Sequence, residues 1–146
     1  MKIAVINGPN LNLLGKRDKT QYGSFSLEEM KAMLGSEFTD IEFDFYQSNT
    51  EGSIINKLQS LSGFDGLIIN PGGYAHTSVA IRDALAELNI PKIEVHLSNL
   101  AAREEFRQNL LTASVCDGYI SGFKEKSYYA AVYLLKNKIE DKGGES

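Results

Sequence analysis

Residues 66–97 read GLIINPGGYAHTSVAIRDALAELNIPKIEVHL, and this stretch decides the fold class. The run GLIIN is apolar and the turn-forming residues PGG stop it, which predicts a buried strand over Gly66–Asn70. A Thr or Ser at positions 77–78 caps a predicted helix that continues through Leu88. The segment Pro91–Leu97 is a second short apolar run and predicts another strand. A strand, a helix and a strand in this order are typical of two parallel strands in one sheet.

The same alternation extends in both directions along the chain. Further strands are predicted at Lys2–Asn7, Ile41–Tyr46 and Gly118–Ser121. Further helices are predicted from Ser26 to about Phe38, around Ile54–Leu61, as a short turn over Ala101–Phe106, and from about Lys126 to Ile139. Five strands that alternate with helices predict an α/β fold, a doubly wound five-stranded parallel sheet with helices on both faces. Residues 140–146 are polar and glycine-rich and are expected to fray.

Length and composition favour one globular domain over residues 1–146. Fifteen basic and nineteen acidic side chains give a net charge of -4, and the lysines are scattered, so no nucleic acid is expected as a partner. No apolar run approaches the roughly 18 residues that cross a bilayer, so no membrane span is expected. The single cysteine, Cys116, cannot form an internal disulfide, and the N-terminus has no leader pattern, so a cytoplasmic location is expected.

Ligands bind doubly wound sheets beyond the carboxyl ends of the strands, which locates the expected site. The segments after the first, third and fourth strands are GPNLNLL, NPGGYAHTS and HLSNLAAREEFR, and each is rich in hydrogen-bonding groups. The loop over residues 8–24 is too irregular for a helix and long for a simple connection, so it is expected to be functional. Its glycines, Gly15 and Gly23, suit a lid that excludes water.

The fourth predicted strand ends in Glu94-Val95-His96, which points to acid and base chemistry. Because side chains alternate along a strand, Glu94 and His96 face the same side. A carboxylate beside an imidazole favours its charged form and fixes its tautomer, so His96 is a candidate general acid or base. A purely structural hydrogen bond to this histidine is an equal alternative at this point.

Other candidate side chains lie in the neighbouring segments. His76 and Asn70 are placed to contact a ligand, although a turn with a helix cap explains the same residues. Arg17 and Tyr22 are close in the long loop, and a guanidinium beside a phenol stabilises the phenolate, which can act as a base. Most loop tyrosines and arginines have no such role.

Arg103 and Arg107 are one helical turn apart and can present positive charge to a carboxylate. Pairing with Glu104 or another surface acid is the more common role of such arginines.

Signatures of cofactor enzymes are missing from the chain. It has no GxGxxG, GxxxxGK[ST] or GxSxG motif. Two histidines and one cysteine without paired spacing predict no zinc site. No cofactor or metal is therefore expected.

Four motifs together resemble the type II 3-dehydroquinate dehydratases, also called type II dehydroquinases. The motifs are INGPNLNLLGKRDKTQYG at positions 6–23, QSNTEG at 47–52, NPGGYAHTSVAIRDAL at 70–85 and IEVHLSNLAAREEFR at 93–107. This resemblance covers almost the whole chain. It implies a flavodoxin-like fold without cofactor or metal, and the removal of water from 3-dehydroquinate to give 3-dehydroshikimate in the shikimate pathway. Quinate breakdown through the same reaction stays open.

The resemblance also implies catalytic roles for residues at matching positions. Tyr22 is the base that removes a proton next to the ketone, and Arg17 supports its ionised form. An ordered water near Asn10 stabilises the resulting enolate. His96, oriented by Glu94, then protonates the departing C1 hydroxyl in an anti elimination.

The remaining implied residues bind the substrate. They are Asn70, His76 and Arg107, the Leu97 and Ser98 segment for the carboxylate, and Asp83, which reaches into a neighbouring subunit's site. This last role requires a homo-oligomer, and the resemblance implies a dodecamer built from trimers.

Three positions depart from the usual pattern of the family. Asp18-Lys19 replaces a common Glu-Pro, Gln108-Asn109-Leu110 replaces a basic pair followed by Ser, and Ser127 replaces a common Gly. None of them is a catalytic position. The first change is expected to alter the mobility of the lid, and the second to alter the packing behind Arg107.

Other classes of protein share the predicted fold. A flavin mononucleotide-binding module needs a Ser/Thr-rich loop where this chain has GPNLNLL, and a phospho-acceptor receiver needs Asp where it has Asn70. An inactive relative is expected to lack Tyr22, Arg17 or His96, and all three are present. The enzyme is therefore the favoured interpretation.

Overall fold

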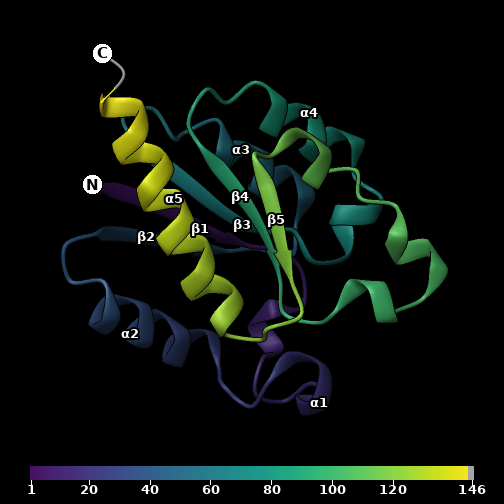
Figure 1. Cartoon of the computed structure of the whole chain (residues 1–146). Coiled ribbons are helices and arrows are strands. Elements are labelled where there is room, and N and C mark those ends of the chain that lie inside the picture. The colour runs from purple at the N-terminus through teal and green to yellow at the C-terminus, as the bar shows by residue number, and fades with distance from the viewer. Residues whose placement is uncertain (145–146) are drawn as a thin grey trace.

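The computed structural model describes residues 1–144, and a five-stranded parallel sheet forms its centre (Figure 1). The strands are β1 (Lys2–Asn7), β2 (Glu42–Gln47), β3 (Gly66–Asn70), β4 (Lys92–His96) and β5 (Gly118–Ser121). Their order is β2-β1-β3-β4-β5, and every neighbouring pair is parallel. This is the strand order of flavodoxin-like sheets. The predicted fold class is confirmed. Strand β2 begins and ends one residue later than predicted, and β4 is one residue shorter at each end.

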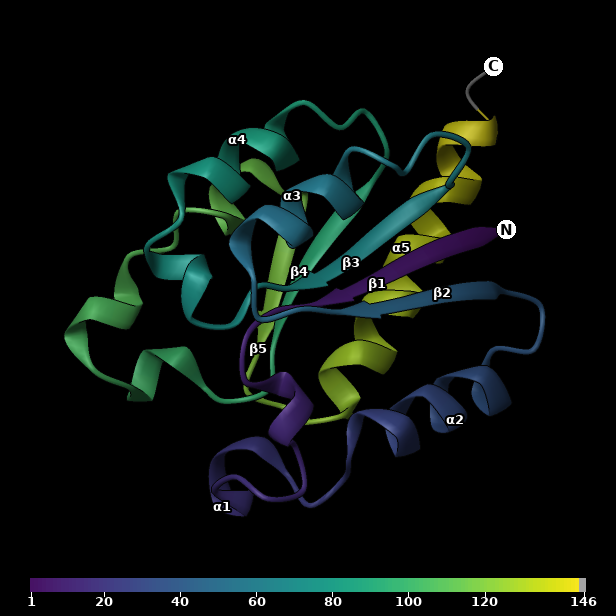
Figure 2. The same ribbon diagram turned by 180° about the vertical axis from the view of Figure 1, so that it is seen from behind.

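Helices cover both faces of the sheet (Figure 2). One face carries α2 (Leu27–Glu37) and α5 (Lys126–Gly144), and the other carries α3 (Glu51–Leu58) and α4 (Val79–Ala86). Along β1, Ile3 and Val5 pack in the core beneath α2 and α5, whereas Ala4 and Ile6 pack in the core beneath α3 and α4. Since successive side chains point to opposite faces, a strand covered on both sides has to be apolar throughout.

The last helix is longer than the sequence pattern predicts. It continues to Gly144, so the predicted end at Ile139 is too early and residues 140–144 are helical. Lys142 Nζ donates a hydrogen bond to the carbonyl of Asn89 at 3.3 Å, which ties this end of the helix to the segment before β4. Residues 145–146 of the tail that was expected to fray lie outside the described residues.

The long loop over residues 8–24 contains two short helices, η1 (Leu11–Leu13) and α1 (Lys19–Tyr22), so the expectation of an irregular segment is wrong there. The Asp18 carboxylate caps α1 by accepting from the main-chain N–H of Thr20 at 2.9 Å. A helix of one turn has no apolar periodicity, which is the signal on which the prediction depended.

The turn predicted over Ala101–Phe106 is two 3₁₀ helices, η3 (Leu100–Ala102) and η4 (Glu105–Gln108). Arg103 lies between them, so Arg103 and Arg107 do not share the face of one helix. The Gln108 side-chain amide donates to the carbonyl of Leu100 at 2.6 Å and holds the two turns together.

Within residues 1–144, we find no helix with the length and apolar character that a membrane crossing requires.

Candidate active site

A cleft opens beyond the carboxyl ends of β1, β3 and β4, where the sequence predicts the site. Its volume is about 540 Å³, including the mouth that is open to solvent. Nine predicted site residues line it: Asn10, Arg17, Tyr22, Asn70, His76, His96, Leu97, Ser98 and Arg107. The rest of the lining is Pro9, Leu11, Gly72, Gly73, Leu100 and Arg103.

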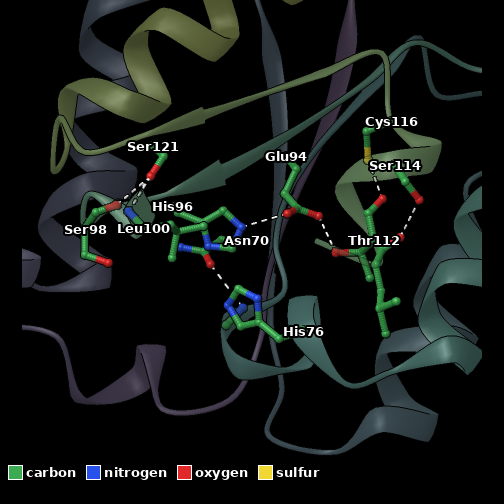
Figure 3. A network of polar contacts seen from close by, with 12 residues as sticks. Asn70, His76, Glu94, His96, Ser98, Leu100, Thr112, Ser114, Cys116 and Ser121 are labelled. Carbon is green, nitrogen blue, oxygen red and sulfur yellow. Dashed lines mark hydrogen bonds and ion pairs between the residues drawn. The ribbon is translucent and has the colours of Figure 1, made fainter. Parts of the chain in front are cut away.

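Strand β4 places the side chains of Glu94 and His96 together, as their spacing predicts (Figure 3). Glu94 Oε2 lies 2.7 Å from His96 Nε2, and the Glu94 side chain is completely buried. The other carboxylate oxygen, Oε1, accepts a hydrogen bond from the hydroxyl of Thr112. Facing an ionised carboxylate, His96 Nε2 carries a hydrogen and acts as the donor.

The second ring nitrogen of His96, Nδ1, is the one that reaches the cleft. In the part of the chain that the structure describes, every fully buried side-chain nitrogen or oxygen has a hydrogen-bond partner. Only Nε2 of His96 is hydrogen-bonded to protein, so Nδ1 is open to the space that His96 lines. This nitrogen is therefore available to exchange a proton with a bound molecule.

His76 ends the 3₁₀ helix η2 (Gly72–His76) and is held by a main-chain carbonyl. Its Nδ1 lies 3.0 Å from the carbonyl oxygen of Asn109, so Nδ1 carries the hydrogen. Burial lowers the pKa of His76, and the neighbouring His96 lowers it further. At neutral pH His76 is a neutral ring whose Nε2 can accept a hydrogen bond from a ligand.

Asn70 is oriented by partners on both sides of its amide. Its Oδ1 accepts from the N–H of Gly72, and its Nδ2 donates to the hydroxyl of Tyr128, each at 3.1 Å. The Tyr128 hydroxyl in turn donates to Asn7 Oδ1. Burial raises the pKa of Tyr128, so this hydroxyl keeps its proton and stays a donor. One Nδ2 hydrogen of Asn70 is left for a ligand.

Two guanidinium groups lie close to the Tyr22 ring. Arg17 Cζ is 3.9 Å from the centroid of the Tyr22 ring, and Arg103 Cζ is 5.5 Å from it. The predicted proximity of Arg17 to Tyr22 is confirmed, although the guanidinium lies over the ring face. A guanidinium group over an aromatic ring at this distance is attracted to the ring by a cation–π interaction.

The arginines near Ser98 form the positively charged side of the cleft. Arg103 Nη1 donates to Ser98 Oγ at 2.9 Å. Arg107 Nε lies 2.6 Å from Glu104 Oε2, and Arg103 Nε lies 3.6 Å from the same oxygen. Each arginine therefore pairs with Glu104, and each also lines the cleft, where it can present positive charge to a ligand. Such a site suits the carboxylate of a small anion.

Asn10 stands at the mouth of the cleft in a left-handed conformation with φ of 70°. Its main-chain N–H donates to Asn49 Oδ1 at 3.0 Å, which ties the first loop to the segment after β2. Asn tolerates this conformation better than most residues.

Asp83 is the one predicted substrate-binding residue outside the cleft. It is exposed on α4, and its Oδ1 lies 3.3 Å from Arg82 Nη1.

Three residues of the site are not among those that the resemblance implies. Arg103 is predicted from the sequence only as a positive charge for a carboxylate. Thr112 and Tyr128 lie far along the chain from the residues they contact, and no local pattern marks them. Only the fold brings them to Glu94 and Asn70.

Within residues 1–144, no group of three or more His, Cys, Asp and Glu side chains is arranged to hold a metal ion.

The chain is similar to known proteins along almost all of its length. The model of the family "Dehydroquinase class II" matches residues 1–136. The 3-dehydroquinate dehydratase of Thermotoga petrophila is 51% identical over 143 residues, which cover 97% of this chain and 99% of that protein.

Solved structures agree with this similarity. The type II dehydroquinase of Butyrivibrio crossotus has a TM-score of 0.90 at 50% identity, and the match covers 93% of this chain and 97% of that one. The type II dehydroquinase of Propionibacterium acnes has a TM-score of 0.86 at 34% identity, with 92% and 96% covered. The fold, the four motifs and these relatives agree, and the chain belongs to the class II dehydroquinase family.

Proposed function

We propose that this protein is a 3-dehydroquinate dehydratase, a hydro-lyase that converts 3-dehydroquinate to 3-dehydroshikimate and water. One observation carries the proposal: His96, which is paired with the buried carboxylate of Glu94, lines the same cleft as Tyr22, whose ring lies close to two guanidinium groups. An elimination needs a base for one proton and an acid for the leaving group, and these two units supply them.

In the first step Tyr22, as phenolate, removes a proton from the carbon next to the ketone, and an enolate forms. The guanidinium groups of Arg17 and Arg103 stabilise the negative charge on Tyr22 and on the substrate. Asn10 holds a water that donates to the enolate oxygen.

In the second step the enolate collapses, the bond from C1 to its hydroxyl breaks, and a carbon–carbon double bond conjugated with the ketone forms. His96 gives a proton to the departing hydroxyl, which leaves as water. Glu94 stabilises the charged imidazole before the transfer and holds the ring in place. The base stands on the loop that carries α1 and the acid on the end of β4, so they can act on different faces of the substrate, as an anti elimination requires.

The substrate carboxylate binds beside Leu97 and Ser98, where Arg103 and Arg107 add positive charge. Asn70 and the neutral His76 hold the ring hydroxyls, since each has a free donor or acceptor.

Asp83 acts in a neighbouring subunit's cleft in this proposal, within a dodecamer built from trimers. The exposure of Asp83 and its position outside its own cleft support this role. The enzyme serves the shikimate pathway in the cytoplasm. Light scattering tests the assembly, and a monomer with full activity would contradict the role of Asp83.

The reaction is tested by ultraviolet absorbance of the conjugated enone of 3-dehydroshikimate, with 3-dehydroquinate as substrate and a metal chelator present. We expect turnover by the natural chain and by Tyr133→Phe, a matched control at an exposed position on α5 outside the cleft. Tyr22→Phe should be inactive but folded. Absence of turnover by the folded natural chain would contradict the proposed function.

A further inference from the structure

Thr112 contacts the catalytic pair from behind the cleft. Its side chain is completely buried, and its hydroxyl donates to Glu94 Oε1 (Figure 3). Thr112 is not among the residues that line the cleft. Any effect of this residue on a bound molecule therefore has to pass through Glu94.

The main chain fixes the position of Thr112. Its N–H and that of Leu111 donate to the carbonyl of Ala75, at 3.4 and 2.9 Å. Its own carbonyl accepts from the N–H of Val115 in η5 (Ala113–Val115) at 3.2 Å. The hydroxyl is thus supported by η5 on one side and by η2, which carries His76, on the other.

The two oxygens of Glu94 have one protein partner each. Oε1 accepts from Thr112 and Oε2 faces His96 Nε2. The terminal torsion of a glutamate side chain is broad, so a carboxylate with one partner can turn about it. A buried carboxylate that loses a donor also binds a proton more readily. The Thr112 hydroxyl opposes both changes.

The charged and titratable groups around Glu94 come from several elements. They are His96 and Lys92 on β4, Tyr119 opposite Glu94 on β5, His76 on η2, Arg107 on η4, and Cys116 after η5. Burial raises the pKa of Cys116 to about 12, with Glu94 adding to the rise, so this thiol is neutral at physiological pH. Burial lowers the pKa of His76, so this ring is also neutral near physiological pH.

We propose that Thr112 is a positioning residue for His96: its hydrogen bond to Glu94 Oε1 keeps Oε2 on Nε2 of the imidazole and so leaves Nδ1 to transfer the proton. This inference rests on the proposed function, in which His96 is the acid. Thr112 itself touches no substrate atom and acts through Glu94.

The test compares Thr112→Val, which keeps the shape and removes the hydroxyl, with Thr112→Ser, which keeps the hydroxyl. Ser114→Ala is the matched control, because Ser114 Oγ donates to the Leu111 carbonyl at 2.7 Å in the same turn and does not contact Glu94. We expect Thr112→Val to lower kcat about tenfold or more, the usual size of a lost hydrogen bond to a charged group, with little change in KM. The limb of the kcat pH profile that depends on the acid should also shift, because the imidazole loses the carboxylate that stabilises its charged form. Thr112→Ser and Ser114→Ala should match the natural chain in both respects.

A second readout does not depend on turnover. Deuterium exchange at the imidazole Cε1, followed by mass spectrometry, reports the protonation of each of the two histidines separately. We expect the His96 exchange profile against pH to shift in Thr112→Val and to stay unchanged in Thr112→Ser and Ser114→Ala. This shift should occur whether or not 3-dehydroquinate is turned over, so failure of the proposed function is distinguished from failure of this inference.

Unchanged kcat and an unchanged His96 profile in a folded Thr112→Val variant would overturn the proposal. If that variant does not fold, Thr112→Ala removes the same hydroxyl and leaves a smaller side chain. If neither Thr112→Val nor Thr112→Ala folds while Thr112→Ser behaves like the natural chain, the hydroxyl contributes to stability alone. This result would also overturn the proposal.

Discussion

The imidazole rings of His76 and His96 stack with their centroids 6.0 Å apart and their planes inclined by 28°. Their partners differ, since His76 faces a main-chain carbonyl and His96 a buried carboxylate. Burial lowers the pKa of His76, and repulsion between two positive charges this close lowers it further. The arrangement therefore keeps His76 neutral.

A neutral, buried His76 predicts a specific dependence of stability on pH. The unfolded chain binds a proton on this residue as the pH falls below 6.5, whereas the folded chain does so only at a lower pH. The free energy of unfolding should therefore fall as the pH is lowered from about 7.5 to about 5, and this fall should be smaller in His76→Asn. Urea denaturation across that range measures both chains. Equal slopes would show that His76 has an ordinary pKa in the folded state.

His96→Ala removes the acid and should lower kcat by about 10²- to 10⁴-fold, the usual contribution of a positioned proton donor. Binding of the product, measured by calorimetry, should change much less, because His96 is only one of many residues that line the cleft. Near-normal turnover by the folded variant would remove His96 as the acid.

Asp18 caps the helix that carries Tyr22, and this cap should depend on its charge. The hydroxyl of Thr20 and then its main-chain N–H hold the pKa of Asp18 below its ordinary value of 3.8. The cap is present at neutral pH and is lost only as the pH falls below 3.8. Amide hydrogen exchange over residues 16–23 should show protection in the natural chain above that pH. Asp18→Ala should lack this protection at every pH.

Asp18→Asn is the matched control, because Asn caps helices well and does not titrate. It should keep the protection even below pH 3.8. Equal protection in the Ala and Asn variants would mean that the cap does not order α1.

Tyr128→Phe should weaken both the fold and ligand binding. It removes the hydroxyl that joins Asn7 to Asn70, two buried amides on neighbouring strands. An unsatisfied buried polar group costs about 1–3 kcal/mol, and KM should rise because Asn70 is no longer oriented. Tyr133→Phe, an exposed position on the same helix, is the control and should change neither quantity. Urea denaturation and steady-state kinetics would measure both effects. An unchanged KM would show that Gly72 alone orients Asn70.

Gly8→Ala tests the closest approach between two loops of the site. A Cβ at this position would lie 2.4 Å from the carbonyl oxygen of Pro71, which is main chain and cannot move aside cheaply. We expect a loss of about 1–3 kcal/mol or more in the free energy of unfolding. Gly52→Ala, with no atom within 4 Å of the added Cβ, lies in α3 and should be neutral or stabilising. Denaturant unfolding of the two variants should separate them.

Sequence patterns predicted β1 and β3 most clearly, because each is a short apolar run that strong turn residues follow. KIAVIN is followed by Gly-Pro and GLIIN by Pro-Gly-Gly, so the positions of both strands were clear. The same patterns missed α1, which is a single capped turn. They also predicted one turn where the structure has two 3₁₀ helices, η3 and η4, which the side-chain amide of Gln108 joins by donating to the carbonyl of Leu100. Local signals are weak in such short elements because few residues contribute to them.

The departures from the family pattern have partial structural explanations. Asp18 is a helix cap, and Gln108 holds the turns that carry Arg103 and Arg107. Ser127 is buried and its hydroxyl accepts from the N–H of Phe123 at 3.1 Å.

The sequence by itself determined the order of strands and helices, the pairing of Glu94 with His96 and the candidates in the first loop. These depend on periodicity and on spacings of a few residues, which local backbone geometry enforces. Only the tertiary structure decided that Arg103 joins Arg17 around Tyr22, that Tyr128 orients Asn70, and that Thr112 holds Glu94. Such contacts depend on how distant segments pack, because a parallel sheet brings together the ends of strands that are far apart along the chain.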